Sequence, residues 1–247
     1  MLAQNYVTNW RTCQAHILSC YPNEGGGVVD KKNKFHPLEN LAENKKSAFE
    51  PAPVDFSDVR CVLHSHTYNP LETQFDDNRV PSIQDMKGQI DTDVEWAIVV
   101  CEGENVTPPF FWGDYDHRPP LMEREFIHSV QDCLCFMQDW QYKNSGLKLP
   151  MFPRKPDWFT SGEDHMMDQY KGWGFNKVAD GDRKKGDVIF YRIQSSVVNH
   201  IGVVLDENTV AHHLYGRFPK VEPFTVWHKY IYQIIRHVTN DTPKGVA

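Results

Sequence analysis

Four prolines lie within the segment from Glu102 to Pro120, at positions 108, 109, 119 and 120, among acidic and aromatic residues. Proline lacks the backbone N–H and has a fixed φ, so such a segment suits a connection better than a helix or a central strand. A chain of 247 residues is long enough for two compact cores. We therefore predict two domains, residues 1–105 and 121–247, joined by a Pro-rich linker over 106–120.

Hydrophobic spacing indicates the elements of the first domain. Apolar residues at Trp10, Cys13 and Ile17 recur with helical spacing and predict a helix over Val7–Cys20. Ser82 precedes the start of a second predicted helix. Short apolar runs predict strands at 28–29, 48–49, 60–64 and 96–100.

In the second domain the pattern predicts helices first and strands afterwards. Asp132 and Gly146 bracket a helix as N-cap and C-terminal glycine, and Ser161–Asp164 has the form of a capping box before a shorter helix. Strands are predicted at 187–191, 200–205, 209–213 and 230–237. This order is typical of the α+β class.

Composition narrows the classes of partner. Residues 1–115 carry 9 Lys and Arg against 17 Asp and Glu, and residues 116–247 carry 17 against 16. Neither half has the basic excess of a nucleic-acid-binding protein. No apolar run reaches the roughly 20 residues that span a bilayer, so we expect no membrane insertion. The first residues lack the pattern of a secretory signal, so we expect folding in the cytoplasm.

The first domain contains residue types suited to a hydrolytic metal site. His64 and His66 lie two apart on a predicted strand and therefore share a face. Two imidazoles and one carboxylate, here from Asp85, are a ligand set for catalytic Zn²⁺. Glu24 is the candidate base and Ser82 a candidate oxyanion donor. Taken separately, these residues also fit a histidine pair without metal, a capping box and a turn.

The combination resembles the JAMM (Mov34/MPN) metallopeptidase family. Tyr21-Pro22-Asn23-Glu24 follows the first helix, Val62–His66 matches the His-Ser-His strand, and Pro81–Asp85 matches the helix entry. The resemblance implies a JAMM-type α/β domain that uses zinc to cleave peptide or isopeptide bonds. Thr67 stands where the family usually has proline, and residues 67–80 form an apparent insertion.

The second domain contains a candidate cysteine nucleophile. Cys133 would begin a helix, where the dipole favours the thiolate, and its base would be an imidazole. His200 and His212 lie on consecutive predicted strands that a hairpin could bring together. The alternative is a buried structural cysteine with histidines on solvated strand faces. None of the six cysteines has paired zinc-ligand spacing; they are at 13, 20, 61, 101, 133 and 135.

Residues 121–237 resemble an NlpC/P60 cysteine peptidase domain. The matching segments are Asp132-Cys133, Lys185–Phe190, Asn199–Val203 and Ala211–His213. The resemblance implies a papain-like fold.

It also assigns roles to three residues. Cys133 becomes the nucleophile, His200 the base and His212 its orienter, with His213 as a less favoured occupant of the third role. Phe126 stands where the family often has a tyrosine, whose hydroxyl could donate to the oxyanion.

The order of the two domains is similar to the tail-tip assembly protein K family of lambda-like siphophages. This resemblance implies a phage tail assembly protein with two peptidase activities. Its partners would be tail-tip proteins, and its substrate the γ-D-glutamyl-diaminopimelate bond of peptidoglycan stem peptides. It would act in the host cytoplasm during assembly, and at the virion tail tip and host periplasm on infection.

Two other functions remain open at the level of sequence. One is a structural or chaperone-like tail-tip assembly factor with vestigial active sites. The other is a host-type cell-wall hydrolase, against which the absence of a secretory pattern argues.

Overall fold

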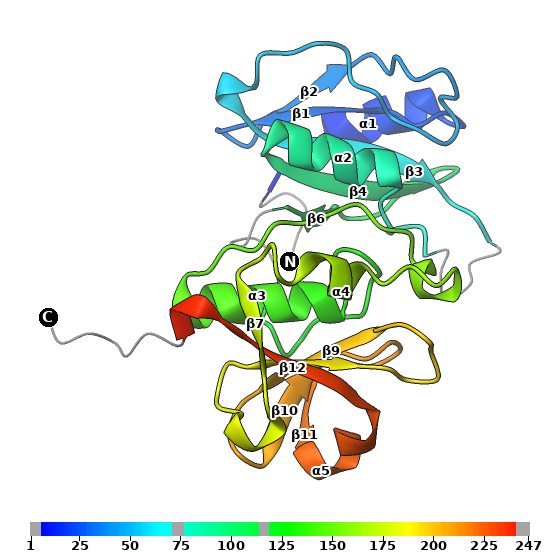
Figure 1. Cartoon of the computed structure of the whole chain (residues 1–247). Coiled ribbons are helices and arrows are strands. Elements are labelled where there is room, and N and C mark those ends of the chain that lie inside the picture. The colour runs from blue at the N-terminus through cyan, green and yellow to red at the C-terminus, as the bar shows by residue number, and fades with distance from the viewer. Residues whose placement is uncertain (1–5, 71–76, 114–118, 241–247) are drawn as a thin grey trace, which may run out of the picture. The chain divides into compact units, whose positions relative to one another are not determined.

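The computed structural model describes residues 6–70, 77–113 and 119–240, which form two compact units (Figure 1). The first unit runs to Arg118 and also includes Phe152–Lys155. The second comprises Pro119–Met151 and the chain from Pro156 onward. Each unit has its own helices and its own six-stranded sheet, so the fold is mixed α/β. Among the described residues, no helix is both long and apolar enough to cross a membrane.

The first unit is built on a mixed sheet of order β2-β1-β3-β4-β5, with β6 also paired to β4. Only β3 and β4 run parallel, and α2 supplies the crossover that a parallel pair requires. The elements are α1 (Trp10–Cys20), β1 (Gly26–Asp30), β2 (Phe35–Leu38), η2 (Phe56–Asp58), β3 (Val59–Thr67), α2 (Ile83–Thr92), β4 (Glu95–Glu102), β5 (Asn105–Val106) and β6 (Phe110–Trp112).

Side-chain alternation along β3 separates the two faces of this sheet. Leu63 belongs to the apolar cluster that α1 completes. His64 and His66 therefore point to the opposite face. On that face α2 lies so close to β4 that a Cβ at Gly88 would come within 2.6 Å of the Trp96 ring. The two histidines thus share a face with α2.

The second unit places helix α3 before an entirely antiparallel sheet of order β11-β10-β9-β8-β12-β7. The segments are α3 (Cys133–Ser145), η3 (Trp158–Thr160), α4 (His165–Gln169), β7 (Phe175–Val178), η4 (Asp180–Asp182), β8 (Val188–Tyr191), β9 (His200–Val204), β10 (Thr209–His212), β11 (Lys220–Pro223), α5 (Phe224–Trp227), η5 (His228–Tyr230), β12 (Ile231–His237) and η6 (Val238–Asn240).

Helix α3 is the central helix of the second unit. Its residues from Cys133 to Gln141 are all buried, and the helix packs against β9 and β10. The Gln141 side chain donates to the Gly186 carbonyl at 2.8 Å, and buried Asp139 is paired with Arg124. Gly146 ends the helix with φ +74°, a left-handed conformation that favours glycine. These contacts fix the position of the helix within the second unit.

The structure confirms most of the predicted elements and corrects three details in the first unit. Helix α1 begins at Trp10 rather than Val7. No strand forms at residues 48–49; instead Phe49 is buried in a loop and stacks on the His64 ring. The predicted linker over 106–120 contains β6, which pairs with β4 because its aromatic residues extend the apolar sheet. Residues 114–118 lie outside the described ranges.

In the second unit the predicted capping box at Ser161 does not form. The Ser161 hydroxyl donates to the Trp158 carbonyl at 2.8 Å, and α4 begins only at His165. The serine side chain therefore closes the preceding 3-10 turn rather than opening a helix. Strands β2, β5, β6, β7 and β11 were not predicted, since they are short and lack clear apolar alternation.

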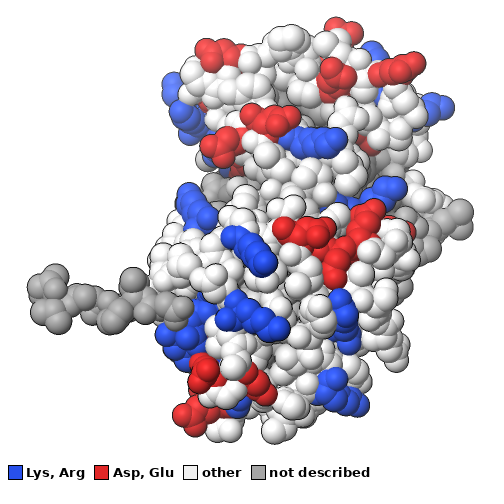
Figure 2. Space-filling model, in the orientation of Figure 1, with Lys and Arg blue, Asp and Glu red and all other residues white. Residues whose placement is uncertain are grey.

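Acidic and basic side chains are interspersed on the face shown in Figure 2. Basic side chains do not merge there into a continuous surface in either unit. A protein that binds nucleic acid through phosphates presents clustered Lys and Arg. Among the described residues on this face, basic side chains form no continuous surface of that kind.

Candidate functional sites

Cys133 is the first residue of α3, as predicted. The Asp132 carboxylate accepts the N–H groups of Leu134 and Cys135, both at 3.1 Å, and also that of Ser129 at 2.8 Å. Cys133 is 8 % exposed. A thiol in the first turn feels the positive end of the helix dipole, which favours the thiolate.

His200 and His212 meet across the β9–β10 hairpin. His200 Nε2 and His212 Nδ1 are 2.9 Å apart, and both rings are buried. Antiparallel pairing of His212 with Gly202 brings the rings together. The pair packs with two aromatic rings: the Tyr191 centroid lies 5.5 Å from that of His200, and the Trp227 centroid lies 4.6 Å from that of His212. The helix that begins with Cys133 packs against β9, the strand that carries His200.

His213 does not contact His200 in this way. Adjacent strand residues point to opposite faces, and the His213 ring packs edge-on against Phe126 and Phe136. Its Nε2 lies 3.1 Å from the Arg217 carbonyl. The structure therefore places His212, and not His213, beside the candidate base.

Burial governs the ionisation of both paired histidines. It lowers the pKa of His200 well below the usual value, and the charges of His212 and Arg217 lower it further. It also lowers the pKa of His212, although the hydrogen bond to Glu222 partly opposes this. Both imidazoles are neutral at neutral pH. A neutral imidazole accepts a proton, and His200 Nε2 already faces His212, so Nδ1 is the nitrogen left for that role.

Two aromatic residues bear on the candidate site in different ways. Tyr191 stacks on His200 with ring centroids 5.5 Å apart and restrains the orientation of the imidazole. Phe126, which stands where a tyrosine is often found, lies edge-on to Tyr215 at 5.6 Å and offers no hydroxyl. Any oxyanion donor must therefore come from another group, such as the backbone N–H groups at the start of α3.

Sequence reasoning missed Glu222, whose Oε2 lies 2.8 Å from His212 Nε2. Glu222 lies on β11, and that strand pairs with β10. No motif marked this glutamate. In the sequence it stands out only as one of two charged residues, with Lys220, that alternate on a short strand and so share a face.

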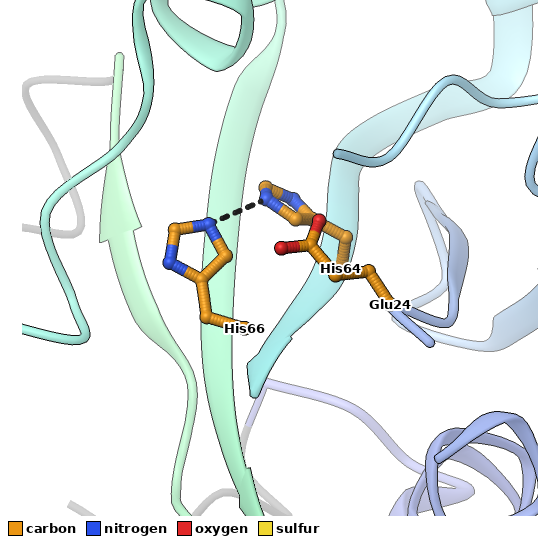
Figure 3. Close-up of side chains that lie close together, drawn as sticks. All are labelled: Glu24, His64 and His66. Carbon is orange, nitrogen blue, oxygen red and sulfur yellow. Dashed lines mark hydrogen bonds between the residues drawn. The ribbon is translucent and has the colours of Figure 1, made fainter. Parts of the chain in front are cut away.

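In the first unit, the predicted metal ligands converge at the face of β3 that carries α2. His64 Nε2 and His66 Nε2 are 3.2 Å apart. The two oxygens of Asp85 lie 3.4 Å from His64 Nε2 and 3.5 Å from His66 Nε2. In Figure 3 the Glu24 carboxylate points toward both rings, and its ligand atom lies within 4.8 Å of theirs.

The spacing of the two imidazole nitrogens fits a tetrahedral zinc ion. Ligand atoms about 2.0–2.1 Å from Zn²⁺ are separated by about 3.3 Å along each tetrahedral edge, close to the 3.2 Å between His64 Nε2 and His66 Nε2. One oxygen of Asp85 faces each imidazole, so this carboxylate is placed to supply a third ligand atom. Charges and hydrogen bonds from His64 and His66 outweigh burial, which alone would raise the pKa of Asp85, and keep that pKa well below its usual range. His66 Nδ1 lies 2.8 Å from the Asn78 carbonyl, the kind of contact that orients a metal-bound imidazole.

Glu24 is 5 % exposed, and burial raises the pKa of its carboxyl. Its Oε2 has no hydrogen-bond partner within the described part of the chain. Gly25 N donates to Ser65 Oγ at 3.0 Å, which fixes the Glu24 loop against β3. A Cβ at Gly26 would lie 2.5 Å from the Leu63 carbonyl, so only glycine permits this approach. The glycine run therefore brings Glu24 to the histidines.

Ser82 forms the capping box that the alternative interpretation of the sequence expects. Its Oγ accepts the Asp85 N–H at 3.1 Å, and Asp85 Oδ2 accepts the Ser82 N–H at 2.7 Å. Ser82 also lines an open groove of about 480 Å³, bounded on its other side by residues 42–50. The Asp85 carboxylate can therefore cap α2 and face the two histidines at the same time. Ser82 lies at the edge of the groove.

The two departures from the JAMM pattern also have structural counterparts. Thr67 Oγ1 donates to the Pro22 carbonyl at 3.1 Å, which ties the end of β3 to the Glu24 loop. Asn78, near the end of the apparent insertion, accepts the Asn69 N–H at 2.8 Å and supplies the carbonyl that contacts His66. A described residue of the insertion, Asn78, therefore contacts one of the candidate ligands. Its residues 71–76 lie outside the described part.

Comparisons with known proteins match one family to the second half of the chain and one phage protein to most of its length. The NlpC/P60 family matches residues 107–236. Tail tip assembly protein K of Escherichia phage N15 is 27% identical over 243 residues, covering 90% of this chain and 91% of the relative. Tail tip assembly protein K of Escherichia phage lambda is 28% identical over 154 residues, covering 62% and 73%.

A solved structure was also matched, a Staphylococcus aureus protein of the NLP/P60 family described as similar to lipoprotein. The match has 18% identity and a TM-score of 0.33, and it covers 47% of this chain and 36% of that one.

Proposed function

This chain belongs to the NlpC/P60 family, and we propose that its second unit is a cysteine peptidase with Cys133 as nucleophile, His200 as base and His212 as orienter. The observation that carries the proposal is the 2.9 Å contact between His200 Nε2 and His212 Nδ1 on the strand that packs against α3.

The chemistry would follow from these positions. The Cys133 thiol gives its proton to His200 Nδ1, and the thiolate attacks the carbonyl carbon of the scissile amide. Backbone N–H groups at the start of α3 stabilise the oxyanion. His200 returns the proton to the leaving amine, which leaves a thioester that water then hydrolyses. His212 holds the ring of His200 in place throughout.

The substrate and the biological setting are proposed from the relatives. The full-length similarity to tail tip assembly protein K of phage N15 supports a role in assembling a phage tail tip, with other tail-tip proteins as partners. We propose that the peptidase acts on peptidoglycan stem peptides at the γ-D-glutamyl-diaminopimelate bond. The protein would be made in the host cytoplasm and reach the periplasm with the virion tail tip.

Digestion of purified peptidoglycan tests the cysteine peptidase. Cys133→Ser should lower the release of muropeptides by at least about 10³-fold, because it removes the nucleophile. Cys135→Ser is the matched control, since Cys135 occupies the same buried turn of α3 and should retain most activity. Equal cleavage by wild type and Cys133→Ser contradicts the assignment.

A second function is favoured by the convergence of His64, His66 and Asp85. The first unit would be a JAMM-type metallopeptidase in which these three residues hold Zn²⁺. When bound, the ion would polarise the scissile carbonyl and acidify a water molecule. Glu24, held within 4.8 Å of both imidazoles, would take the proton of that water, and Ser82 Oγ would donate to the developing oxyanion.

Elemental analysis tests the metal site without requiring turnover. Purified wild type should contain about one zinc per chain, and His64→Ala should lose it. His36→Ala, which removes an exposed histidine of β2, is the control and should retain the metal. Zinc content that is unchanged in His64→Ala contradicts the site.

The competing function is a non-catalytic tail-tip assembly factor with vestigial sites, and the substitutions at Thr67 and Phe126 favour it. Complementation of a phage that lacks this protein separates the alternatives. Infectious particles formed with the combined His64→Ala, His66→Ala and Cys133→Ser chain would favour the assembly factor. Loss of infectivity with intact particles would favour the peptidase.

A further inference from the structure

Glu222 is the most strongly hydrogen-bonded carboxylate next to the histidine pair. Its Oε2 accepts from His212 Nε2 at 2.8 Å and from Trp227 Nε1 at 2.7 Å. The Arg217 guanidinium contacts Oε1 at 3.3 Å and Oε2 at 3.2 Å. Burial raises the pKa of the Glu222 carboxyl, but the bonds from His212 and Trp227 and the charge of Arg217 outweigh it, so that the pKa lies below its usual value. Glu222 is therefore an anion at neutral pH.

An ionised carboxylate accepts hydrogen bonds and donates none. Nε2 of His212 must therefore carry the proton in its contact with Glu222. In a neutral imidazole the other nitrogen is then an acceptor, so His212 Nδ1 accepts from His200 Nε2–H. It follows that His200 Nδ1 is the unprotonated nitrogen, which is the form that a base requires.

If these hydrogen bonds ran in the opposite direction, His200 could not act as the base. If His212 Nε2 were an acceptor, its Nδ1–H would donate to His200 Nε2, and His200 Nδ1 would already carry a proton. Apart from His212, Glu222 accepts one N–H from Trp227 and two from Arg217, and these donors favour its ionised, acceptor-only state. One acidic side chain thus selects the tautomers of two histidines.

We propose that Glu222 is a positioning residue that sets the tautomers of His212 and His200, so that His200 presents an unprotonated Nδ1 to Cys133. This role extends the proposed peptidase site from three residues to four, and it rests on the proposed function of Cys133. Glu222 takes no proton in the cycle. Its negative charge stabilises the imidazolium that forms when His200 accepts the thiol proton.

Other charged or polar groups also surround the pair. Tyr191 of β8 stacks on His200, and electrostatic contributions to the His200 ring come from groups on three further segments. These groups are Asp132 before α3, His213 after β10 and Arg217 before β11. The ring nitrogens are linked in series, from His200 to His212 and from His212 to Glu222. The carboxylate at the end of this series therefore determines which nitrogens carry protons.

Nuclear magnetic resonance of ¹⁵N-histidine-labelled protein tests the assignment directly, because long-range ¹H–¹⁵N correlations distinguish the two tautomers. The signals are assigned with His200→Gln and His212→Gln. Wild type should show His200 and His212 protonated at Nε2. Glu222→Gln, whose amide can donate, should populate the opposite tautomers. A wild-type His212 protonated at Nδ1, or tautomers unchanged in Glu222→Gln, would overturn the proposal.

Two further measurements separate positioning from folding. Glu222→Gln should lower kcat for muropeptide release by about tenfold or more with little change in KM, since a hydrogen bond to a charged group is lost. Glu207→Gln, an exposed glutamate of the same unit, is the control and should match wild type. If Glu222→Gln fails to fold, Trp227→Phe removes a single donor to Glu222 and should shift the tautomer signals partway; unchanged signals would overturn the proposal.

The tautomer measurement requires no turnover, so it tests the role of Glu222 separately from the peptidase activity. Predicted tautomers in a protein that cleaves no peptidoglycan would support the role of Glu222 and contradict the proposed peptidase. Cleavage that depends on Cys133 but not on Glu222 would support the peptidase and overturn the role of Glu222.

Discussion

Ser82 and Asp85 bond to each other twice: Ser82 Oγ accepts the Asp85 N–H, and Asp85 Oδ2 accepts the Ser82 N–H. The same carboxylate faces His64 and His66. One aspartate therefore both starts α2 and completes a candidate ligand set. A fixed helix start orients the carboxylate before any metal binds, which reduces the entropy lost on binding.

Because Asp85 has both roles, substitutions at Ser82 and at Asp85 should have different effects. Ser82→Ala removes one cap and should lower the free energy of unfolding of the first unit by about 1 kcal/mol while retaining zinc. Asp85→Asn keeps a capping side chain and should lose zinc affinity by at least about tenfold. Chemical denaturation of metal-free protein and zinc titration measure the two effects. Equal zinc affinity in Asp85→Asn and wild type would contradict the ligand assignment.

The buried histidines predict that the second unit is less stable in acid. Burial lowers the pKa of His213 to about 4 and that of His200 well below its usual value. In the unfolded chain these groups have pKa values of about 6.5, so the unfolded state binds more protons below that pH. The stabilisation is complete above about pH 6.5 and is lost as the pH falls toward the folded values.

Denaturation of the second unit at a series of pH values measures this dependence. Each group contributes at most about 1.4 kcal/mol per pH unit between its two pKa values. His213→Gln should reduce the slope between about pH 4 and pH 6.5. The exposed His228 is in the same unit, and His228→Gln should leave most of the slope unchanged. A wild-type stability that is flat from pH 4 to pH 7 contradicts the prediction.

Gly26 should tolerate no side chain. An added Cβ would lie 2.5 Å from the Leu63 carbonyl and 2.9 Å from His64 Cα, both backbone atoms that move only with their strands. Gly26→Ala should therefore destabilise the first unit by about 1–3 kcal/mol and weaken zinc uptake. Gly181→Ala is the control, since a Cβ added there would meet no atom within 4 Å. Denaturation and zinc titration of the two variants provide the comparison.

Asp132 should be the most sensitive cap in the second unit. Its carboxylate accepts three backbone N–H groups at the turn that contains Cys133. Asp132→Ala should cost about 1–2 kcal/mol of unfolding free energy, whereas Asp132→Asn keeps an acceptor and should cost less. Thermal unfolding followed by circular dichroism measures both. A melting temperature of Asp132→Ala equal to that of wild type would show that the cap contributes little.

Local sequence patterns were sufficient for the parts of both sites that lie within one element. The two-residue period of a strand places His64 and His66 on one face, and helix-capping rules place Cys133 after its cap at Asp132. These inferences depend only on neighbours in the chain. They also explain why the helix over Cys133–Ser145 was predicted almost to the residue.

Patterns failed where the outcome depended on a distant partner. The run at 48–49 resembled a strand, but Phe49 is buried against the His64 ring instead of pairing in a sheet. The aromatic strand Phe110–Trp112 lies in a Pro-rich segment and forms because it extends β4. In both cases tertiary burial of an aromatic side chain outweighed the local preference.

By itself, the sequence determined the order of the elements, the residue types of two candidate sites and the residues that share a strand face. Only the tertiary structure decided that His212 rather than His213 meets His200, and that Glu222 lies behind it. The physical reason is that strand pairing joins residues far apart in the chain. The register of β9, β10 and β11 is set by which faces are buried, and no single segment contains that information.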